Sequence, residues 1–242
     1  MIYGDIGQDW WSDDGVTDTM IHEGLQALDQ NAAKHCVHLN SPGGRVDMGL
    51  TIMNLLRAHK AQMKALNPEF QLETIVDGYA LSAASVIFMA GDIRTVCLGG
   101  IVMIHDAWSG IYGNAADMRT AADKMDMLSG NIASIYASLC TPALPDASPR
   151  DAASFRALML AETYFVASEA VASGLATRED LTTTANLHSD LTPERLKGNY
   201  VETMTAHYKK RTYNKPTASK SILDAKLAMQ RFKLLEATIA LT

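Results

Sequence analysis

Three times within residues 1–91, a short run of apolar residues leads through a turn containing glycine into a helical pattern. The apolar runs cover 1–7, 35–40 and 72–79, and the helical patterns begin at Thr17, Val46 and Ala80. Successive strand and helix units joined by right-handed crossovers build a largely parallel sheet with helices packed on it. The repetition therefore predicts an α/β fold.

Further units continue beyond the third repeat within the same domain. Two short strands are expected at 93–98 and 101–107, around the Gly99–Gly100 turn. The longest helical pattern covers 114–139, with Asn114 as its expected N-cap. Its apolar residues recur at three- and four-residue spacing: Met118, Ala122, Met125, Leu128, Ile132 and Ile135. A helix with such a stripe has apolar surface to bury.

The composition changes towards the end of the chain. A proline-rich loop at 142–150 precedes a helix at 151–162. We expect the domain 1–182 to end after the apolar run at 164–176. Residues 183–242 hold ten Lys or Arg against five Asp or Glu, although the net charge of the whole chain is −6. They are expected to form a linker and an amphipathic helical extension, which either packs within an oligomer or docks on another protein. The apolar positions of this helix are Ile222, Leu223, Leu227, Phe232, Leu234 and Leu235.

Composition excludes several classes of protein. No stretch approaches the roughly 18 uninterrupted apolar residues of a membrane span, and the first residues lack the pattern of a secretory signal. The acidic body argues against nucleic acid as its partner. The histidines have no metal-ligand spacing with cysteines or carboxylates, and no phosphate-binding glycine loop is present. We therefore expect neither a metal nor an organic cofactor.

Three separated segments carry the parts of a nucleophilic site. A serine hydroxyl needs a base to remove its proton and amide N–H groups aimed at the developing oxyanion. Ser82 lies among small residues at a strand-to-helix turn, which would expose the N–H of Ala83 at the helix start. Gly44 closes a Ser-Pro-Gly-Gly turn that can approach a substrate carbonyl, and His105 ends an apolar strand as the candidate base. Ser85, one helical turn beyond Ser82, is an alternative nucleophile, although packing explains it more simply.

Four motifs, taken in this order, resemble the Clp protease proteolytic subunit (ClpP) over roughly residues 1–180. They are NSPGG at 40–44, GYALSAAS at 78–85, MIHDAW at 103–108 and FVASEAVASGLA at 165–176. Within that family the chain is similar to the ClpP-related head maturation (prohead) proteases of tailed phages. This closer likeness is carried by the tryptophan pair 10–11, HDAWSGIYGNAADMR at 105–119 and AETYF at 161–165.

The resemblance implies residue roles. Ser82 would be the nucleophile and His105 the general acid and base, and the amides of Gly44 and Ala83 would form the oxyanion hole. The family's third catalytic residue is an aspartate whose position here is Glu162, and a glutamate can also accept a hydrogen bond from the second ring nitrogen. Two other acids remain open for this role, namely Asp106, which strand alternation should point away from His105, and Asp151.

The resemblance also implies a fold and partners. The fold would be the ClpP/crotonase-like spiral of β-β-α units, with 114–139 as a protruding handle helix through which rings stack. A homo-oligomeric ring would cleave scaffold or capsid protein in the bacterial host cytoplasm, within or on the procapsid. Because the chain begins at its first strand, without the family's segment for docking an ATPase ring, an unfoldase partner is not expected. The extension at 183–242 would then dock on capsid or scaffold protein.

Two other functions remain open for this sequence. One is an inactive relative that serves as a scaffold or assembly protein. The other is an acyl-CoA enzyme of the crotonase kind, which shares the spiral fold and the paired amides of the oxyanion hole. Such an enzyme would not need Ser82 and His105 in these places.

Overall fold

The computed structural model describes residues 1–7, 15–141 and 151–182. The predicted loop at 142–150 and the predicted extension at 183–242 lie outside the described residues. The described elements, in chain order, are β1 (Ile2–Tyr3), α1 (Asp18–Gln26), β2 (Lys34–Ser41), α2 (Val46–Leu66), β3 (Gln71–Leu81), α3 (Ala83–Phe88), β4 (Ile93–Cys97), β5 (Ile101–Ile104), α4 (Ala115–Leu139), α5 (Ala152–Leu160), β6 (Thr163–Val166), α6 (Ala167–Ala172) and β7 (Arg178–Asp180). Among these helices, none is long and apolar enough to cross a membrane.

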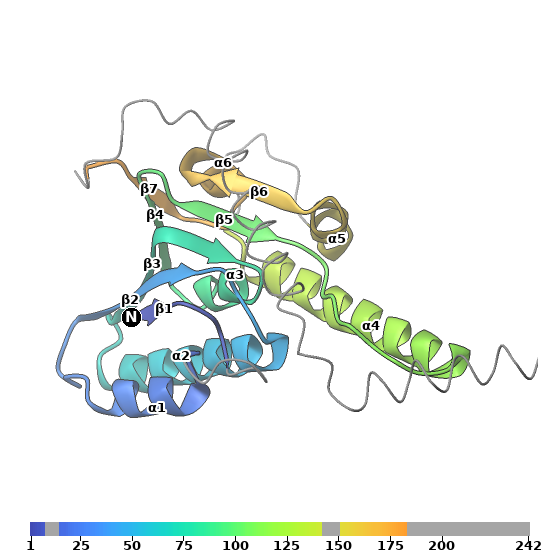
Figure 1. Ribbon diagram of the computed structural model, residues 1–242. Helices are drawn as coiled ribbons and strands as arrows, with labels where there is room; N and C mark the ends of the chain where they lie inside the picture. The colour runs from blue at the N-terminus through green and yellow to red at the C-terminus, as the bar shows by residue number, and fades with distance from the viewer. Residues whose placement is uncertain (8–14, 142–150, 183–242) are drawn as a thin grey trace, which may run out of the picture. The chain divides into compact units, whose positions relative to one another are not determined.

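The strands form one sheet that branches at β3 (Figure 1). Strands β1, β2, β3, β4 and β7 lie in this order and pair in parallel. The first half of β3 pairs with β4, whereas Tyr79–Leu81 pairs in parallel with β5, which in turn pairs antiparallel with β6. The carboxyl ends of β3 and β5 therefore meet at one place. This largely parallel sheet with its helices confirms the predicted α/β fold.

Helices cover one face of the sheet. Thr74 on β3 donates from its hydroxyl to the Phe88 carbonyl of α3 at 2.8 Å, and α3 packs in turn against α2. Arg94 on β4 points to the same side, where its guanidinium donates to the Leu175 and Gly174 carbonyls at the end of α6. Leu72 and Val76, which share this face of β3 with Thr74, are completely buried. The main apolar core lies between this face and the helices.

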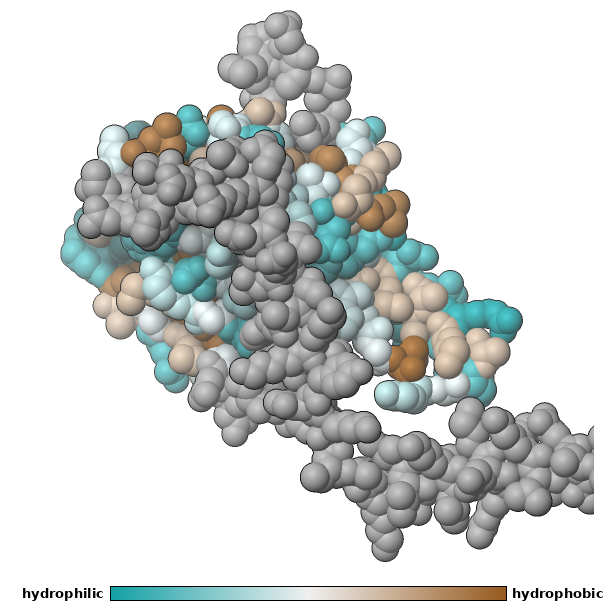
Figure 2. All heavy atoms as spheres, turned by 45° about the horizontal axis from the view of Figure 1, so that its top comes forward, coloured by the Kyte–Doolittle hydropathy of each residue, from teal (hydrophilic) through white to brown (hydrophobic). Residues whose placement is uncertain are grey.

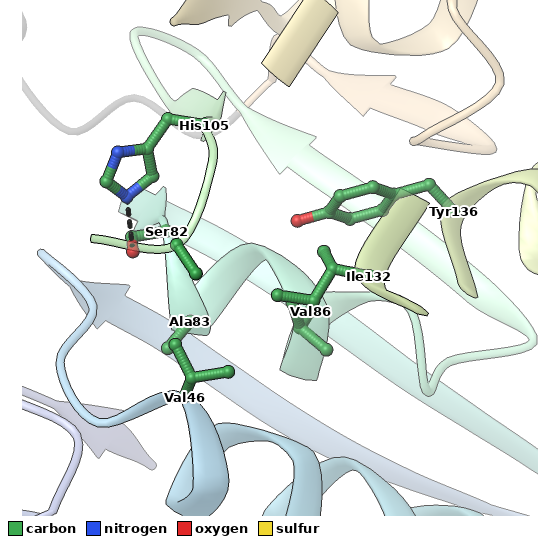
Figure 3. Close-up of a pocket in the computed structure, with 8 residues that line it drawn as sticks. Val46, Ser82, Ala83, Val86, His105, Ile132 and Tyr136 are labelled. Carbon is green, nitrogen blue, oxygen red and sulfur yellow. Dashed lines mark hydrogen bonds between the residues drawn. The ribbon is translucent and has the colours of Figure 1, made fainter. Parts of the chain in front are cut away.

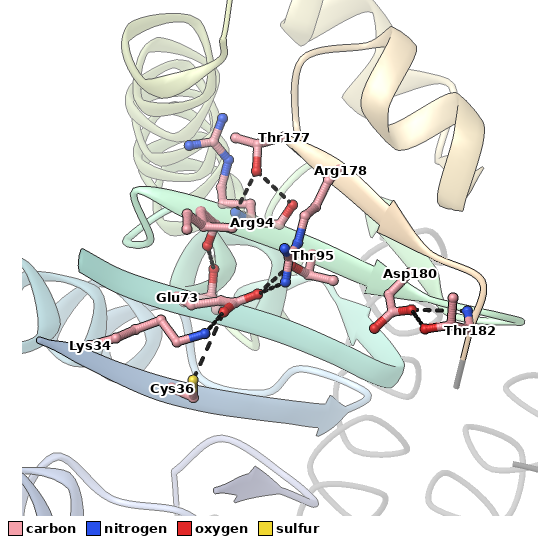
Figure 4. A network of polar contacts seen from close by, with 11 residues as sticks. Lys34, Cys36, Glu73, Arg94, Thr95, Thr177, Arg178, Asp180 and Thr182 are labelled. Carbon is pink, nitrogen blue, oxygen red and sulfur yellow. Dashed lines mark hydrogen bonds and ion pairs between the residues drawn. The ribbon is translucent and has the colours of Figure 1, made fainter. Parts of the chain in front are cut away.

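The opposite face of the sheet holds a buried carboxylate (Figure 4). Glu73 on β3 is 1% exposed and accepts hydrogen bonds from Lys34 at 2.8 Å, from Thr95 at 2.6 Å and from Arg178 at 2.6 Å. Burial on its own raises the pKa of Glu73, but these partners outweigh it and leave the pKa lowered. One carboxylate thus joins side chains from β2, β3, β4 and β7.

Helix α4 begins as the sequence predicts but packs over only part of its length. Asn114 caps it by accepting from the Ala116 and Asp117 amides at 2.8 and 3.1 Å, and Asp117 accepts from the Asn114 amide, completing a capping box. Met118 is 50% exposed, whereas Ile132, further along the predicted stripe, is buried. The first half of the helix projects away from the sheet (Figure 1). In the space-filling view, hydrophilic and hydrophobic residues lie side by side on the part of the described chain that projects at the lower right (Figure 2).

The third helix starts later than the sequence pattern suggests. The pattern predicts a helix from Ala80, but Ala80 and Leu81 belong to β3, where they pair with Val102 and Met103 of β5. Because its last residues pair with β5, strand β3 continues to Leu81, the residue directly before Ser82. The turn into α3 is therefore confined to Ser82 itself.

Candidate active site

The backbone of Ser82 makes the turn between β3 and α3. Its φ of 53° and ψ of −125° lie in a backbone region that residues other than glycine rarely adopt. Such a conformation costs on the order of 1–3 kcal/mol and persists only where the surroundings hold it. Here the Ser82 amide donates to the Met103 carbonyl of β5 at 2.9 Å. The turn places Ser82 between the last residue of β3 and the first residue of α3.

His105 follows directly after β5 and reaches Ser82. Because Leu81 pairs with Met103, the residues that follow the two strands come close together. The distance from Ser82 Oγ to His105 Nε2 is 2.7 Å (Figure 3). In the neutral tautomer that carries its proton on Nδ1, Nε2 accepts the hydrogen bond of the serine hydroxyl. This is the geometry in which a histidine can take the proton of an attacking serine.

The surroundings of His105 favour its neutral form. Burial lowers the pKa of His105, and the nearby charges of Glu162 and Asp106 oppose the shift without cancelling it. A neutral imidazole has a free lone pair, whereas a protonated one has none to receive a proton. The side chain is therefore a base, rather than an acid, at neutral pH.

Glu162 lies next to His105 but is hydrogen-bonded elsewhere. Ile104 pairs with Thr163 across the antiparallel β5 and β6, which brings the residues flanking this pair, His105 and Glu162, side by side. Glu162 has a positive φ of 48°, and its Oε1 accepts from the Tyr164 hydroxyl at 2.7 Å. Within the described residues no hydrogen bond joins Glu162 to His105. The carboxylate thus acts on the imidazole here through its charge.

The alternative site residues are all engaged with other partners. Asp106 pairs with Arg156 of α5 at 2.8 Å, and Asp151 caps α5 by accepting from the Ser154 amide at 2.7 Å. Ser85 is buried and donates to the carbonyl of Ser82 at 2.6 Å. None of these three side chains is hydrogen-bonded to the His105 ring in the described chain.

The glycine turn after β2 lies directly against Ser82. A Cβ on Gly43, whose φ is +96°, would come within 2.7 Å of the Ser82 Cβ and 2.6 Å of the Leu81 carbonyl oxygen. Ile6 donates to Gly43 O at 2.8 Å and accepts from Arg45 N at 2.9 Å, forming a parallel bridge opposite Gly44. In a parallel ladder the residue between two such bonds directs its own N–H to the other side. The amide of Gly44 therefore points away from Ile6.

A small pocket adjoins Ser82 and His105 (Figure 3). Apart from Ser82 and His105, most of its lining is apolar: Val46, Ala83, Val86, Ala107, Ile132 and Tyr136. The sequence alone did not single out Tyr136, which lies one helical turn beyond Ile132 on α4. Its spacing from Ile132 is the signal that could have placed it on the same face. The described residues contain no group of three or more His, Cys, Asp or Glu that could hold a metal ion.

A serine hydroxyl donating to a histidine, beside a glycine turn and a helix start, is the arrangement of a serine hydrolase site. The model of the Clp protease family matches residues 11–178 of the chain. The chain belongs to the Clp protease family. The predicted ClpP-type fold is confirmed by this match together with the parallel sheet and its helices.

One curated relative is the ATP-dependent Clp protease proteolytic subunit of Deinococcus radiodurans. The two sequences are 33% identical over 102 residues. This region covers 41% of the present chain and 46% of the relative, so the match spans less than half the relative's length.

Proposed function

We propose that this protein is a serine endopeptidase that cleaves peptide bonds through an acyl-enzyme. Ser82 attacks the substrate carbonyl, while His105 takes the serine proton and returns it to the leaving amine. Water, activated by the same histidine, then hydrolyses the acyl-enzyme. The amides of Gly44 and Ala83 stabilise the oxyanion. This mechanism needs neither a metal nor an organic cofactor.

The observation that carries the proposal is the 2.7 Å contact between Ser82 Oγ and His105 Nε2. Membership of the Clp protease family supports it, and so does the backbone around Ser82. The Ala83 amide is the first of α3, where amides have no acceptor within the helix, and the Gly44 amide points away from Ile6. Both amides are therefore suited to an oxyanion.

Glu162 is the proposed third member of the triad. Its position beside His105 allows the carboxylate to accept from Nδ1–H after a side-chain rotation away from Tyr164. Such a bond would hold the reactive tautomer and stabilise the imidazolium that forms during acyl transfer. Asp106 and Asp151 are poorer candidates, because one is held in an ion pair with Arg156 and the other caps α5, whereas Glu162 holds only a tyrosine hydroxyl.

The proposed substrates are scaffold or capsid proteins of a phage, processed during head maturation by a homo-oligomeric ring. The likeness to phage head maturation proteases supports this substrate class. The exposed first half of α4, with Met118 and Met127 at its surface, supports self-association through that helix. The largely apolar lining of the pocket favours an apolar substrate side chain next to the cleaved bond.

A fluorophosphonate probe tests the proposed nucleophile. The wild type should be labelled on Ser82, Ser82→Ala should abolish labelling, and Ser173→Ala should keep it. Ser173 is a buried serine that follows α6, and α6 begins opposite Ile101, at the other end of β5 from His105. Labelling that persists in Ser82→Ala would reject Ser82 as the nucleophile. Absence of labelling in the wild type would favour an assembly protein or, if acyl-CoA binds in calorimetry, a crotonase-type enzyme.

The substrate class and the ring are tested separately. Incubation with the scaffold and coat proteins of the same phage should give discrete fragments with the wild type and none with Ser82→Ala. Light scattering at several concentrations should give the mass of an oligomer, several times the 26.2 kDa of one chain. A protein that is labelled by the probe but leaves scaffold and coat intact would be a peptidase with other substrates.

A further inference from the structure

The carbonyl group of Ser82 is held by a residue one helical turn away. Ser85 donates to it twice, from its amide at 3.0 Å and from its hydroxyl at 2.6 Å. On the other side of the residue, the Ser82 amide donates to Met103 at 2.9 Å. The rarely adopted backbone of the candidate nucleophile is therefore fixed from both ends. The bond to Met103 is part of the sheet, whereas the hydroxyl bond depends on one side chain.

The hydroxyl of Ser85 has a second partner, Tyr136 of α4, at 2.8 Å. A serine hydroxyl has one proton to donate, and a carbonyl oxygen can only accept. Because Ser85 donates to Ser82 O, it must accept from the tyrosine hydroxyl. The direction of this series of hydrogen bonds is therefore fixed: Tyr136 donates to Ser85, and Ser85 donates to the Ser82 carbonyl.

Burial makes this series of hydrogen bonds a stable part of the site. Ser85 and Tyr136 are each 1% exposed, so water does not compete for their hydroxyls. The Tyr136 ring lies against Phe155 of α5 with ring centroids 5.7 Å apart, which limits its movement. Burial raises the pKa of Tyr136, so its hydroxyl keeps the proton that it donates throughout the neutral range. A buried hydroxyl network that is fully paired rigidifies its surroundings.

We propose that Tyr136 is a positioning residue for the nucleophile, acting through Ser85 on the backbone of Ser82. The inference rests on the proposed peptidase function and adds to it a part that lies on a different helix. Tyr136 also lines the pocket with its ring, so the ring and the hydroxyl have separate roles. The ring borders the substrate, and the hydroxyl orients Ser82 towards His105.

Tyr136→Phe removes the hydroxyl and keeps the ring. We expect the rate of fluorophosphonate labelling and the kcat for an apolar fluorogenic peptide to fall about 3- to 10-fold, the range set by one neutral hydrogen bond. KM should stay unchanged because the pocket wall is retained. Ser85→Ala breaks the same chain from its other end and should lower kcat to a similar extent. In the double variant the losses should not add, because both substitutions break one series of bonds.

Ser173→Ala is a matched control for Ser85→Ala. Ser173 is buried and donates to the Ala170 carbonyl three residues earlier at 2.9 Å, as Ser85 does to Ser82. Its loss should lower thermal stability comparably and leave kcat unchanged. Unaltered kcat in both Tyr136→Phe and Ser85→Ala, with Ser82 still labelled in the wild type, would overturn the positioning role alone. An unlabelled wild type would overturn the peptidase function and this role with it.

Discussion

The balance of charge around His105 decides when the candidate site can act. Burial lowers the pKa of this histidine, while the negative charge of Glu162 works against that shift. Labelling of Ser82 needs the neutral imidazole, so its rate should rise with pH. The midpoint of this rise should lie below 6.5, the ordinary value for histidine.

Substituting Glu162→Gln separates the two effects of this side chain. Losing the negative charge should move the midpoint of the rate profile to a lower pH, because burial is then less opposed. The plateau should fall by about 10²-fold or more if the carboxylate orients His105. The measurement is the fluorophosphonate labelling rate between pH 4.5 and 8.5. A midpoint that moves upward would contradict the electrostatic account, and an unchanged plateau would remove Glu162 from the triad.

Much of the candidate site could be predicted from local sequence, because its parts lie where strands end. Ser82, Gly44 and His105 each follow an apolar run, and parallel strands bring such ends together. The partners of the acids could not be predicted in this way. Asp106 meets Arg156, which lies fifty positions further along the chain in a helix whose placement depends on tertiary packing. The hydrogen bond between Glu162 and Tyr164 likewise depends on how the two side chains are rotated, which hydrophobic periodicity does not predict.

At the scale of elements, one arginine connects α5, α4 and the segment after β5. Arg156 pairs with Asp106 and with Asp126 of α4, each at 2.8 Å. Within the described chain, Asp106 Oδ1 and Arg156 Nε are buried without a hydrogen-bond partner. Asp106 therefore has little besides Arg156 to balance its charge. It also adjoins His105, so the pair helps to set the path of the chain beyond that residue.

Arg156→Met should destabilise the protein by about 1–3 kcal/mol, because it leaves the Asp106 carboxylate partly buried and unpaired. Adding Asp106→Asn should recover part of this loss, since no buried charge then remains. Urea unfolding of the single and double variants measures both effects. Asp126→Asn is the control, because its carboxylate is 76% exposed and its removal should change stability by less than about 0.5 kcal/mol. Equal losses in Arg156→Met and Asp126→Asn would contradict this account.

The elements also mark where periodicity stops being informative. The sequence predicted the start of α4 because Asn114 and Asp117 form a local capping box. It also predicted one apolar stripe along the helix, yet Met118 is half exposed and only the later part of the stripe is buried. A hydrophobic period identifies a face and not the length over which that face is covered. What covers it depends on elements distant in sequence, such as α5, which packs beside α4.

For the whole molecule, pH should affect stability through groups away from Ser82 as well as through His105. His35 and His59 stack with ring centroids 5.1 Å apart, and His35 Nε2 donates to the Asp29 carbonyl at 2.9 Å. The remaining nitrogen, His35 Nδ1, then accepts from His59 Nε2, also at 2.9 Å. Burial, and next the proximity of His35, lower the pKa of His59. The folded protein therefore resists a proton that the unfolded chain binds with the ordinary pKa of 6.5.

Stability should accordingly decline in two steps as the solution is acidified. A group whose folded pKa is lowered gives its full contribution above its unfolded pKa, so the contributions of His59 and His105 should fade as pH falls below about 6.5. The Glu73 contribution should fade below about 4.5, as protonation weakens its bonds to Lys34 and Arg178. His59→Gln removes one of the two titrating rings and should make the first step shallower while leaving the second. Urea midpoints measured from pH 4 to 8 test this, and an equally steep fall between pH 6.5 and 5 in the variant would show that another group is responsible.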